Sequence, residues 1–185
     1  VPMGAALSEA LGGELDVVLV HKLCSRWSPE YAIGAIDEGG GFFVSDPSEA
    51  DEGWLKAERA RRLQDLRERR ALYSPEHPPI DPHGRVVIIV DDGLATGATM
   101  IAALQAVRAQ GPQKLNCAVP VGAPDSLHKV EPLADEVVCL HAPRGFQAVG
   151  QFYVHFDQVE DAEVVACLRA CHGKATGPPA PDVGG

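Results

Sequence analysis

The chain has 185 residues, of which 45% are hydrophobic and 23% charged, and this size and composition are typical of one globular domain. No apolar run reaches the roughly 20 residues that a helix needs to cross a bilayer, and no secretory leader is recognisable, so we expect a cytoplasmic protein without a membrane partner. The formal net charge of -10 argues against nucleic acid as the main partner, because phosphate contacts need a basic surface. A small phosphorylated ligand stays compatible with this charge, since a helix N-terminus or a metal ion holds a phosphate locally.

The first 45 residues predict one helix and several strands. The stretch "PMGAALSEALGG" predicts a helix with Pro2 in its first turn and Gly12 at its end. The next stretch, "LDVVLV", predicts a buried strand that ends at Val20. A long connection follows, in which "YAIGAI" predicts a short strand, and "FFVS" predicts another.

A long charged helix comes next. Its start is predicted at Asp46–Glu49, where an acid, a proline and a reciprocal capping acid follow one another, and its end at about Tyr73. Many of its residues are Arg and Glu, which predicts a solvated face with i,i+4 pairs such as Glu58 with Arg62. An anion-binding face is the alternative interpretation.

The second half alternates strands and helices. A Pro-rich loop precedes the strand "VVIIV", which has the composition of a fully buried strand, and a helix ended by Gly111 follows. "LNCAVPV", a helix from about Pro124 and "EVVCL" form a second β-α-β unit. An irregular segment, "HAPRGFQAVGQFYVHF", leads into a terminal helix, and we expect the tail 173–185 to be disordered. This alternation predicts an α/β fold with a parallel sheet flanked by helices.

Two adjacent acids, Asp91 and Asp92, follow the strand "VVIIV". In a parallel sheet, ligands bind beyond the carboxyl ends of the strands, and the acids fall at that edge. Adjacent carboxylates either chelate a metal or accept hydrogen bonds from a vicinal diol. The small residues from Gly93 to Thr99 leave backbone N–H groups free at the start of the next helix, which suits a phosphate monoester. The stretch therefore predicts a site for a sugar phosphate, whereas a capped helix without a ligand would not require two acids.

The stretch "VVIIVDDGLATGAT" resembles the signature of the type I phosphoribosyltransferases, which bind phosphoribosyl pyrophosphate. The similarity extends from Val1 to about His172. It includes "ELDVVLVHKL", "PEYAIGAIDEGG" and "GFQAVGQFYVHF", which are similar to a bacterial group of phosphoribosyltransferases whose substrates are generally unassigned. The resemblance implies a Rossmann-like parallel sheet with a small hood segment and a flexible loop.

The resemblance also implies roles for named residues. Asp91 and Asp92 would hold the ribose hydroxyls and, through the substrate, Mg²⁺ as the cofactor. Lys22 would contact pyrophosphate, although an ordinary lysine at a strand end is an equal alternative. The implied activity transfers ribose 5-phosphate to a nitrogenous base, as in nucleotide salvage. The residues implied to wrap the 5-phosphate are Ala95, Thr96, Gly97, Ala98 and Thr99.

The segment after "EVVCL" is implied to recognise the base. Phe146 or Tyr153 would stack on the heterocycle, and Arg144 or Gln147 would form hydrogen bonds with it; packing in a satellite core is the alternative for the aromatic residues. The flexible loop corresponds to about Leu23 to Glu30. Members that act on 6-oxopurines commonly have an acid at the position of Ala95, so the resemblance favours the adenine and orotate branches.

The family normally has a strand and a glycine-containing pyrophosphate loop before the helix near Pro2, and this stretch is absent from the sequence. We therefore expect a phosphoribosyltransferase domain over residues 1–172, and a homodimer. A response-regulator receiver is a rival interpretation, but the next candidate acid, Asp135, precedes its strand instead of following it. A non-catalytic sensor of phosphoribosyl pyrophosphate, or an RNA-binding regulator on the same fold, is the remaining alternative.

Overall fold

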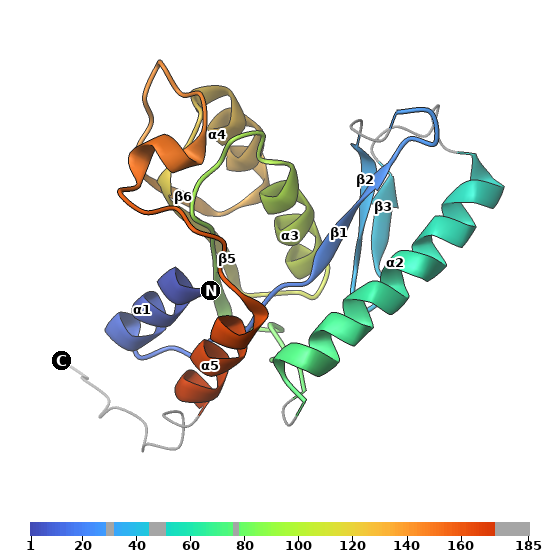
Figure 1. Ribbon diagram of the computed structural model, residues 1–185, viewed down its shortest axis with the longest axis horizontal. Helices are drawn as coiled ribbons and strands as arrows, with labels where there is room; N and C mark the ends of the chain where they lie inside the picture. The colour runs from blue at the N-terminus through green and yellow to red at the C-terminus, as the bar shows by residue number, and fades with distance from the viewer. Residues whose placement is uncertain (29–31, 45–50, 76–77, 173–185) are drawn as a thin grey trace.

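The computed structural model describes residues 1–28, 32–44, 51–75 and 78–172. Figure 1 shows two three-stranded sheets with helix α3, Ala98–Arg108, packed between them. Helix α2, Glu52–Tyr73, covers the far side of the first sheet, and α1, Pro2–Leu11, packs against α5, Asp161–His172. The predicted α/β class is confirmed. No helix in these ranges is both long and apolar enough to span a membrane.

The second sheet is the predicted parallel sheet. Its strands β4, β5 and β6 pair in that order, with Ile89 opposite Cys117 and Cys117 opposite Val137. Helix α3 follows β4, and the short helix α4 follows β5, so both predicted β-α-β units are present. The bounds are β4 Val86–Val90, β5 Lys114–Val121, α4 Pro124–Val130, a 3-10 turn η2 Glu131–Leu133, and β6 Glu136–His141.

The burial of β4 differs from the prediction. Ile89 is buried in the core formed with α3 and α4, but Val86 on the other face is 59% exposed and Ile88 is 37% exposed. The prediction of a fully buried strand is therefore wrong. Helices α3 and α4 cover one face of the sheet, and no described helix buries the outward side chains of β4 on the other face. Apolar composition alone does not report which faces are covered.

The first sheet is antiparallel, with β1 Val20–Cys24, β2 Ala32–Asp37 and β3 Phe42–Val44. β2 and β3 confirm the strands predicted from "YAIGAI" and "FFVS". The predicted strand "LDVVLV" is wrong, because the strand begins at Val20, where the prediction ends it. Its partner β2 ends at Asp37, opposite Val20, so the preceding residues extend beyond the ladder. Leu15 and Leu19 of this stretch instead pack in two separate clusters.

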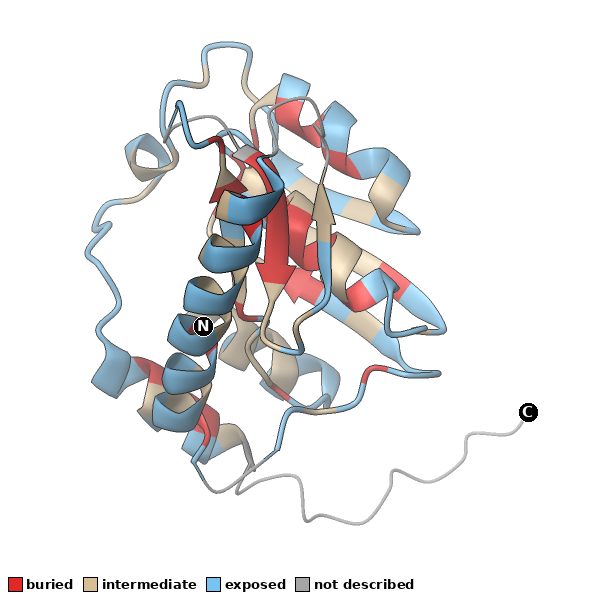
Figure 2. Ribbon diagram, turned by 90° about the vertical axis from the view of Figure 1, so that its right-hand side faces the viewer, coloured by how far each residue is buried: buried red, intermediate tan, exposed pale blue. Residues whose placement is uncertain are grey.

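Helix α2 confirms the predicted solvated helix. Its N-cap is Asp51, whose carboxylate accepts a hydrogen bond from the Trp54 N–H at 2.7 Å, whereas the predicted start at Asp46–Glu49 lies outside the described residues. Only Leu55 and Leu66 are buried, and Figure 2 shows most of α2 as exposed. The helix carries i,i+3 and i,i+4 ion pairs, including the predicted pair of Glu58 with Arg62, whose side chains are half-buried.

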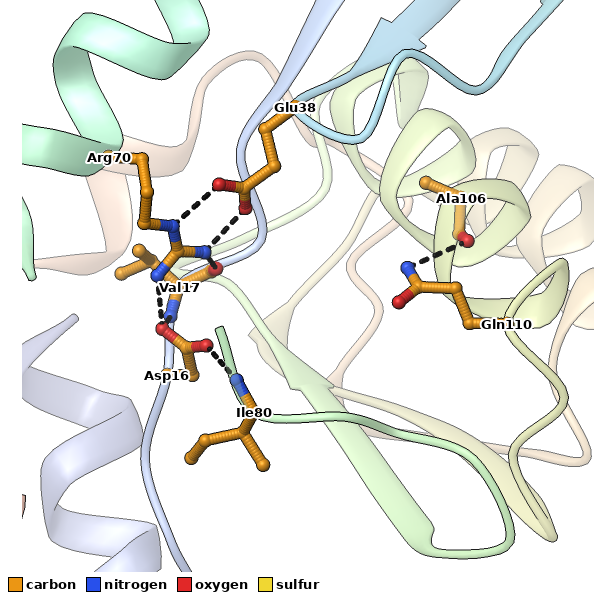
Figure 3. A network of polar contacts seen from close by, with 7 residues as sticks. All are labelled: Asp16, Val17, Glu38, Arg70, Ile80, Ala106 and Gln110. Atoms are coloured by element: carbon orange, nitrogen blue, oxygen red, sulfur yellow. Dashed lines mark hydrogen bonds and ion pairs between the residues drawn. The ribbon is translucent and has the colours of Figure 1, made fainter. Parts of the chain in front are cut away.

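Arg70 joins α2 to the stretch before β1 and to the turn after β2 (Figure 3). Its Nε and one terminal nitrogen donate to the Glu38 carboxylate, and its remaining nitrogen donates to Asp16 at 2.6 Å. The Val17 carbonyl accepts a further bond, and Asp16 also accepts from the Ile80 N–H at 2.9 Å. One half-buried guanidinium therefore fixes three chain segments relative to α2.

Candidate functional site

The two acids lie directly after β4, at the carboxyl end of the parallel sheet. The Asp91 N–H donates to the Ala118 carbonyl at 3.3 Å, which continues the ladder of β4 with β5 by one residue. The Asp92 N–H donates to Asp91 Oδ1 at 3.0 Å. Both side chains are half-buried. Burial raises the pKa of the Asp91 carboxyl above its usual range, and the neighbouring charge of Asp92 raises it further.

Leu94 anchors the loop after the acids, and the residues that follow it are exposed. Leu94 is 2% exposed, its N–H donates to the Val121 carbonyl at 2.9 Å, and its carbonyl accepts from the Ala123 N–H at 2.8 Å. Ala95 and Thr96 after it are exposed. A buried anchor beside exposed small residues gives a rigid loop whose backbone is accessible to a ligand.

Gly97 turns this loop into α3. Its φ of 76° lies in the left-handed region, where a side chain is strained, and the helix begins at Ala98. No side chain caps the helix; the nearest contact is from the Ala98 N–H to Thr96 Oγ1 at 3.4 Å. The first N–H groups of α3 and the positive end of its dipole therefore point toward the exposed loop, as a phosphate site requires.

A residue that the sequence interpretation did not identify also holds the loop. Ser126 of α4 is 3% exposed, and its hydroxyl donates to the Ala95 carbonyl at 2.6 Å. The bond joins the second β-α-β unit to the loop of the first. No sequence signal marks this serine, because its partner is a backbone atom 31 residues away.

The irregular segment after β6 lies against the acids. The Tyr153 hydroxyl donates to the Asp92 carbonyl at 2.7 Å, and in Figure 1 this orange segment lies at the same end of the sheet as the loop before α3. A Cβ added to Gly93 would lie 2.9 Å from both methyl groups of Val149, in the 3-10 turn η3, Val149–Phe152. The structure therefore brings Tyr153 to the acid pair, but through its hydroxyl and a main-chain atom.

The other predicted base-contacting residues are arranged differently. Phe146 stacks on Phe152 with ring centroids 5.7 Å apart, and His141 meets the edge of Phe152 at 5.6 Å. Arg144 is exposed on the turn between β6 and this aromatic group. Tyr153 contacts Phe156 with ring centroids 5.1 Å apart. The aromatic rings thus form a group of three and a separate pair, and the satellite packing considered for Phe146 is present.

Lys22 lies in β1 opposite Ala35, with an exposed side chain. Its ammonium has no hydrogen-bond or ion-pair partner among the described residues, so it is available to a ligand but is not tied to the acid pair. Glu30, at the end of the predicted flexible loop, lies outside the described residues.

The acid pair fits Mg²⁺ in type and in number. Mg²⁺ prefers hard oxygen ligands and is commonly held by one or two carboxylates together with substrate phosphates and water. Asp91 and Asp92 supply two such carboxylates, and their mutual repulsion would decrease beside a cation. Asp91 and Asp92 are therefore the residues that would hold this ion.

The chain is similar in sequence to a known family of proteins. The family model of the phosphoribosyl transferase domain matches residues 1–156. Proteins of two Mycobacterium tuberculosis strains, provisionally assigned as phosphoribosyl transferases, are 40% identical over 176 residues, which is 93% of this chain. The chain spans 40% of the length of those relatives.

A solved structure has the same fold. The crystal structure of TT1426 from Thermus thermophilus superposes with a TM-score of 0.82 at 41% sequence identity. The match covers 90% of this chain and 81% of the TT1426 chain. Since the family model covers most of the sequence and the fold agrees, the chain belongs to the phosphoribosyl transferase domain family.

Proposed function

We propose that the protein transfers the 5-phosphoribosyl group of phosphoribosyl pyrophosphate to a nitrogenous base, with Mg²⁺, and releases pyrophosphate. The observation that carries this proposal is the pair of half-buried carboxylates at the end of β4, followed at once by an exposed loop and the uncapped N-terminus of α3. Carboxylates recognise a diol and N–H groups recognise a phosphate, and a ribose 5-phosphate presents both groups close together.

In this proposal the chain contributes mainly position and charge. Asp91 and Asp92 accept hydrogen bonds from the ribose hydroxyls. The N–H groups from Ala95 to Thr99 bind the 5-phosphate, and Ser126 keeps the Ala95 peptide oriented for that contact. Lys22 approaches the pyrophosphate. Bound Mg²⁺ supplies charge neutralisation of the leaving pyrophosphate.

The reaction breaks the bond between C1 of the ribose and a pyrophosphate oxygen, which leaves with the bonding electrons. A bond forms between C1 and the base nitrogen, and the nitrogen releases its proton to solvent. Positive charge develops on the ribose in the transition state. The carboxylates next to the ribose stabilise that charge, and fixing the two reactants removes much of the entropic cost. The segment 146–153, next to the acids, is the proposed base-binding side. Because Ala95 supplies no acid to the base, adenine or orotate is favoured over a 6-oxopurine.

The test is turnover with a panel of nucleobases. We expect pyrophosphate release from phosphoribosyl pyrophosphate and Mg²⁺ with at least one base, and loss of ligand binding in the double variant Asp91→Asn with Asp92→Asn. The matched control is Asp65→Asn with Glu68→Gln, which removes two acids from the exposed face of α2 and leaves binding unchanged. Binding without release for any base would instead support a phosphoribosyl-pyrophosphate sensor, and unchanged affinity in the double variant would refute the role of the acids.

A further inference from the structure

The hydroxyl of Tyr153 connects two chain segments that are 61 residues apart. It donates to the Asp92 carbonyl at 2.7 Å, and it lies 3.7 Å from the Met3 sulfur of α1. Among the described residues, the Asp92 carbonyl accepts no other hydrogen bond. The sulfur is a weak acceptor at a long distance, so the hydroxyl hydrogen belongs to the Asp92 carbonyl.

A second contact joins the same two segments. Val149 lies so close to Gly93 that its methyl groups occupy the space that a side chain at position 93 would need. The polar contact at Tyr153 and the apolar contact at Val149 lie at the two ends of the turn η3. Two contacts restrain both the position and the rotation of that turn relative to the loop.

We propose that Tyr153 is a positioning residue, which fixes the segment 146–153 to the acid loop 91–94 so that the base-binding side and the ribose-binding side move as one unit. This inference rests on the proposed function only for the identity of the two ligands. Transfer to C1 requires the base nitrogen and the ribose to be aligned, and misplacement by even about 1 Å lowers the rate strongly.

The hydroxyl remains a donor throughout the neutral range. Burial raises the pKa of Tyr153 above its usual value, and the negative charges of Asp92 and Asp91 raise it further. Ionisation therefore does not break this link near neutral pH, and removal of the hydroxyl by mutation is the direct way to break it.

The first measurement is amide hydrogen exchange in the ligand-free protein. Tyr153→Phe should increase exchange in two separate segments together, 92–96 and 149–153, because each restrains the other. The matched control is Tyr73→Phe, which removes a hydroxyl that donates to Asp161 at 2.6 Å. This control should leave both segments unchanged. Wild-type exchange in both segments of Tyr153→Phe would overturn the inference.

The second measurement separates positioning from general stability. In steady-state kinetics we expect Tyr153→Phe to lower kcat/KM for the base about 3- to 10-fold, the usual effect of one lost hydrogen bond, with little change in the affinity for phosphoribosyl pyrophosphate. An equal fold decrease in kcat/KM for the base and in affinity for phosphoribosyl pyrophosphate would contradict a positioning role. If the wild-type protein binds no phosphoribosyl pyrophosphate, the proposed function fails, while the exchange comparison still decides the coupling.

Discussion

Asp91 accepts a hydrogen bond from the backbone N–H of Asp92 at 3.0 Å, yet this bond does not compensate for the burial of its carboxylate and the charge of its neighbour. The pKa of Asp91 is raised in the folded state, so the unfolded chain ionises first as the pH rises. The folded state therefore loses stability as the pH increases from the unfolded pKa to the raised folded pKa. Above that window, at neutral pH, we expect Asp91→Asn to be more stable than wild type in urea denaturation.

Asp135 provides a control of opposite sign. The Leu115 N–H, at 2.7 Å, and the Arg108 guanidinium lower the pKa of the Asp135 carboxyl. The ionised Asp135 carboxylate stabilises the folded state above the unfolded pKa, and this stabilisation is lost as the pH falls through the folded pKa. Asp135→Asn should therefore destabilise the protein at neutral pH. If Asp91→Asn also destabilises the protein, the folded state must favour the ionised Asp91 carboxylate despite its burial. That result would contradict the raised pKa of Asp91.

Cation binding at the proposed site should depend on pH through Asp91. Mg²⁺ or a ribose diol needs the ionised form of Asp91, whose pKa is raised by burial and by Asp92. Cys117, the nearby thiol, stays neutral because burial and Asp91 raise its pKa to about 11. Affinity for Mg²⁺ with phosphoribosyl pyrophosphate, measured by titration calorimetry, should decrease with falling pH already above the range of an ordinary aspartate. A flat profile down to about pH 4, the ordinary aspartate pKa, would contradict this prediction.

Gly93 is required because Val149 and Val121 occupy the space around it. A Cβ at position 93 would lie 2.9 Å from Val149 and 3.0 Å from Val121. We expect Gly93→Ala to lower stability by about 1–3 kcal/mol, and Val149→Ala to restore part of this loss in the double variant. Gly13→Ala is the control, since nothing lies within 4 Å of its Cβ position. Additive losses in the double variant, measured by thermal denaturation, would show that the two segments do not touch.

Ser126 should influence ligand binding without contacting the ligand. Its hydroxyl donates to the carbonyl of Ala95, the first residue of the stretch 95–99 that is proposed to bind the 5-phosphate. We expect Ser126→Ala to weaken the binding of phosphoribosyl pyrophosphate about 3- to 10-fold, as loss of one buried hydrogen bond does. Ser8→Ala removes an exposed bond of the same type and length, from its hydroxyl to the Gly13 carbonyl at 2.6 Å at the end of α1. An equal effect of the two substitutions on affinity would refute the role of Ser126.

The sequence predicted the parts of the site that are local in the chain. The apolar run, the two acids and the small residues up to Thr99 are adjacent, so their order already places them at a strand end and a helix start. The contacts of Ser126 and Val149 were not predictable from the sequence. Ser126 contacts a backbone carbonyl 31 residues away, and Val149 packs against Gly93, which has no side chain to indicate a partner. Tyr153 was identified as an aromatic residue, whereas its hydroxyl contact depends on how the segment after β6 folds back.

The strand errors have the same origin. "LDVVLV" and "VVIIV" are both strongly apolar, but pairing and burial depend on neighbours that composition does not contain. β2 ends opposite Val20 and thereby sets where β1 begins. The outward side chains of β4 are exposed because the described helices cover the opposite face.

Arg70 should stabilise the fold at a place away from the candidate site. Its side chain is 12% exposed and contacts the carboxylates of Asp16 and Glu38, which are themselves mostly buried. Arg70→Ala would leave two such charges unpaired, and we expect a loss of about 3 kcal/mol in urea denaturation. Arg61→Ala, which removes a guanidinium 60% exposed beside Glu58, should leave stability nearly unchanged, because water screens an exposed ion pair. Arg70→Lys should lie between them, because one ammonium cannot reproduce the forked contacts with both acids and the Val17 carbonyl. Equal losses for Arg70→Ala and Arg61→Ala would contradict the role of the network.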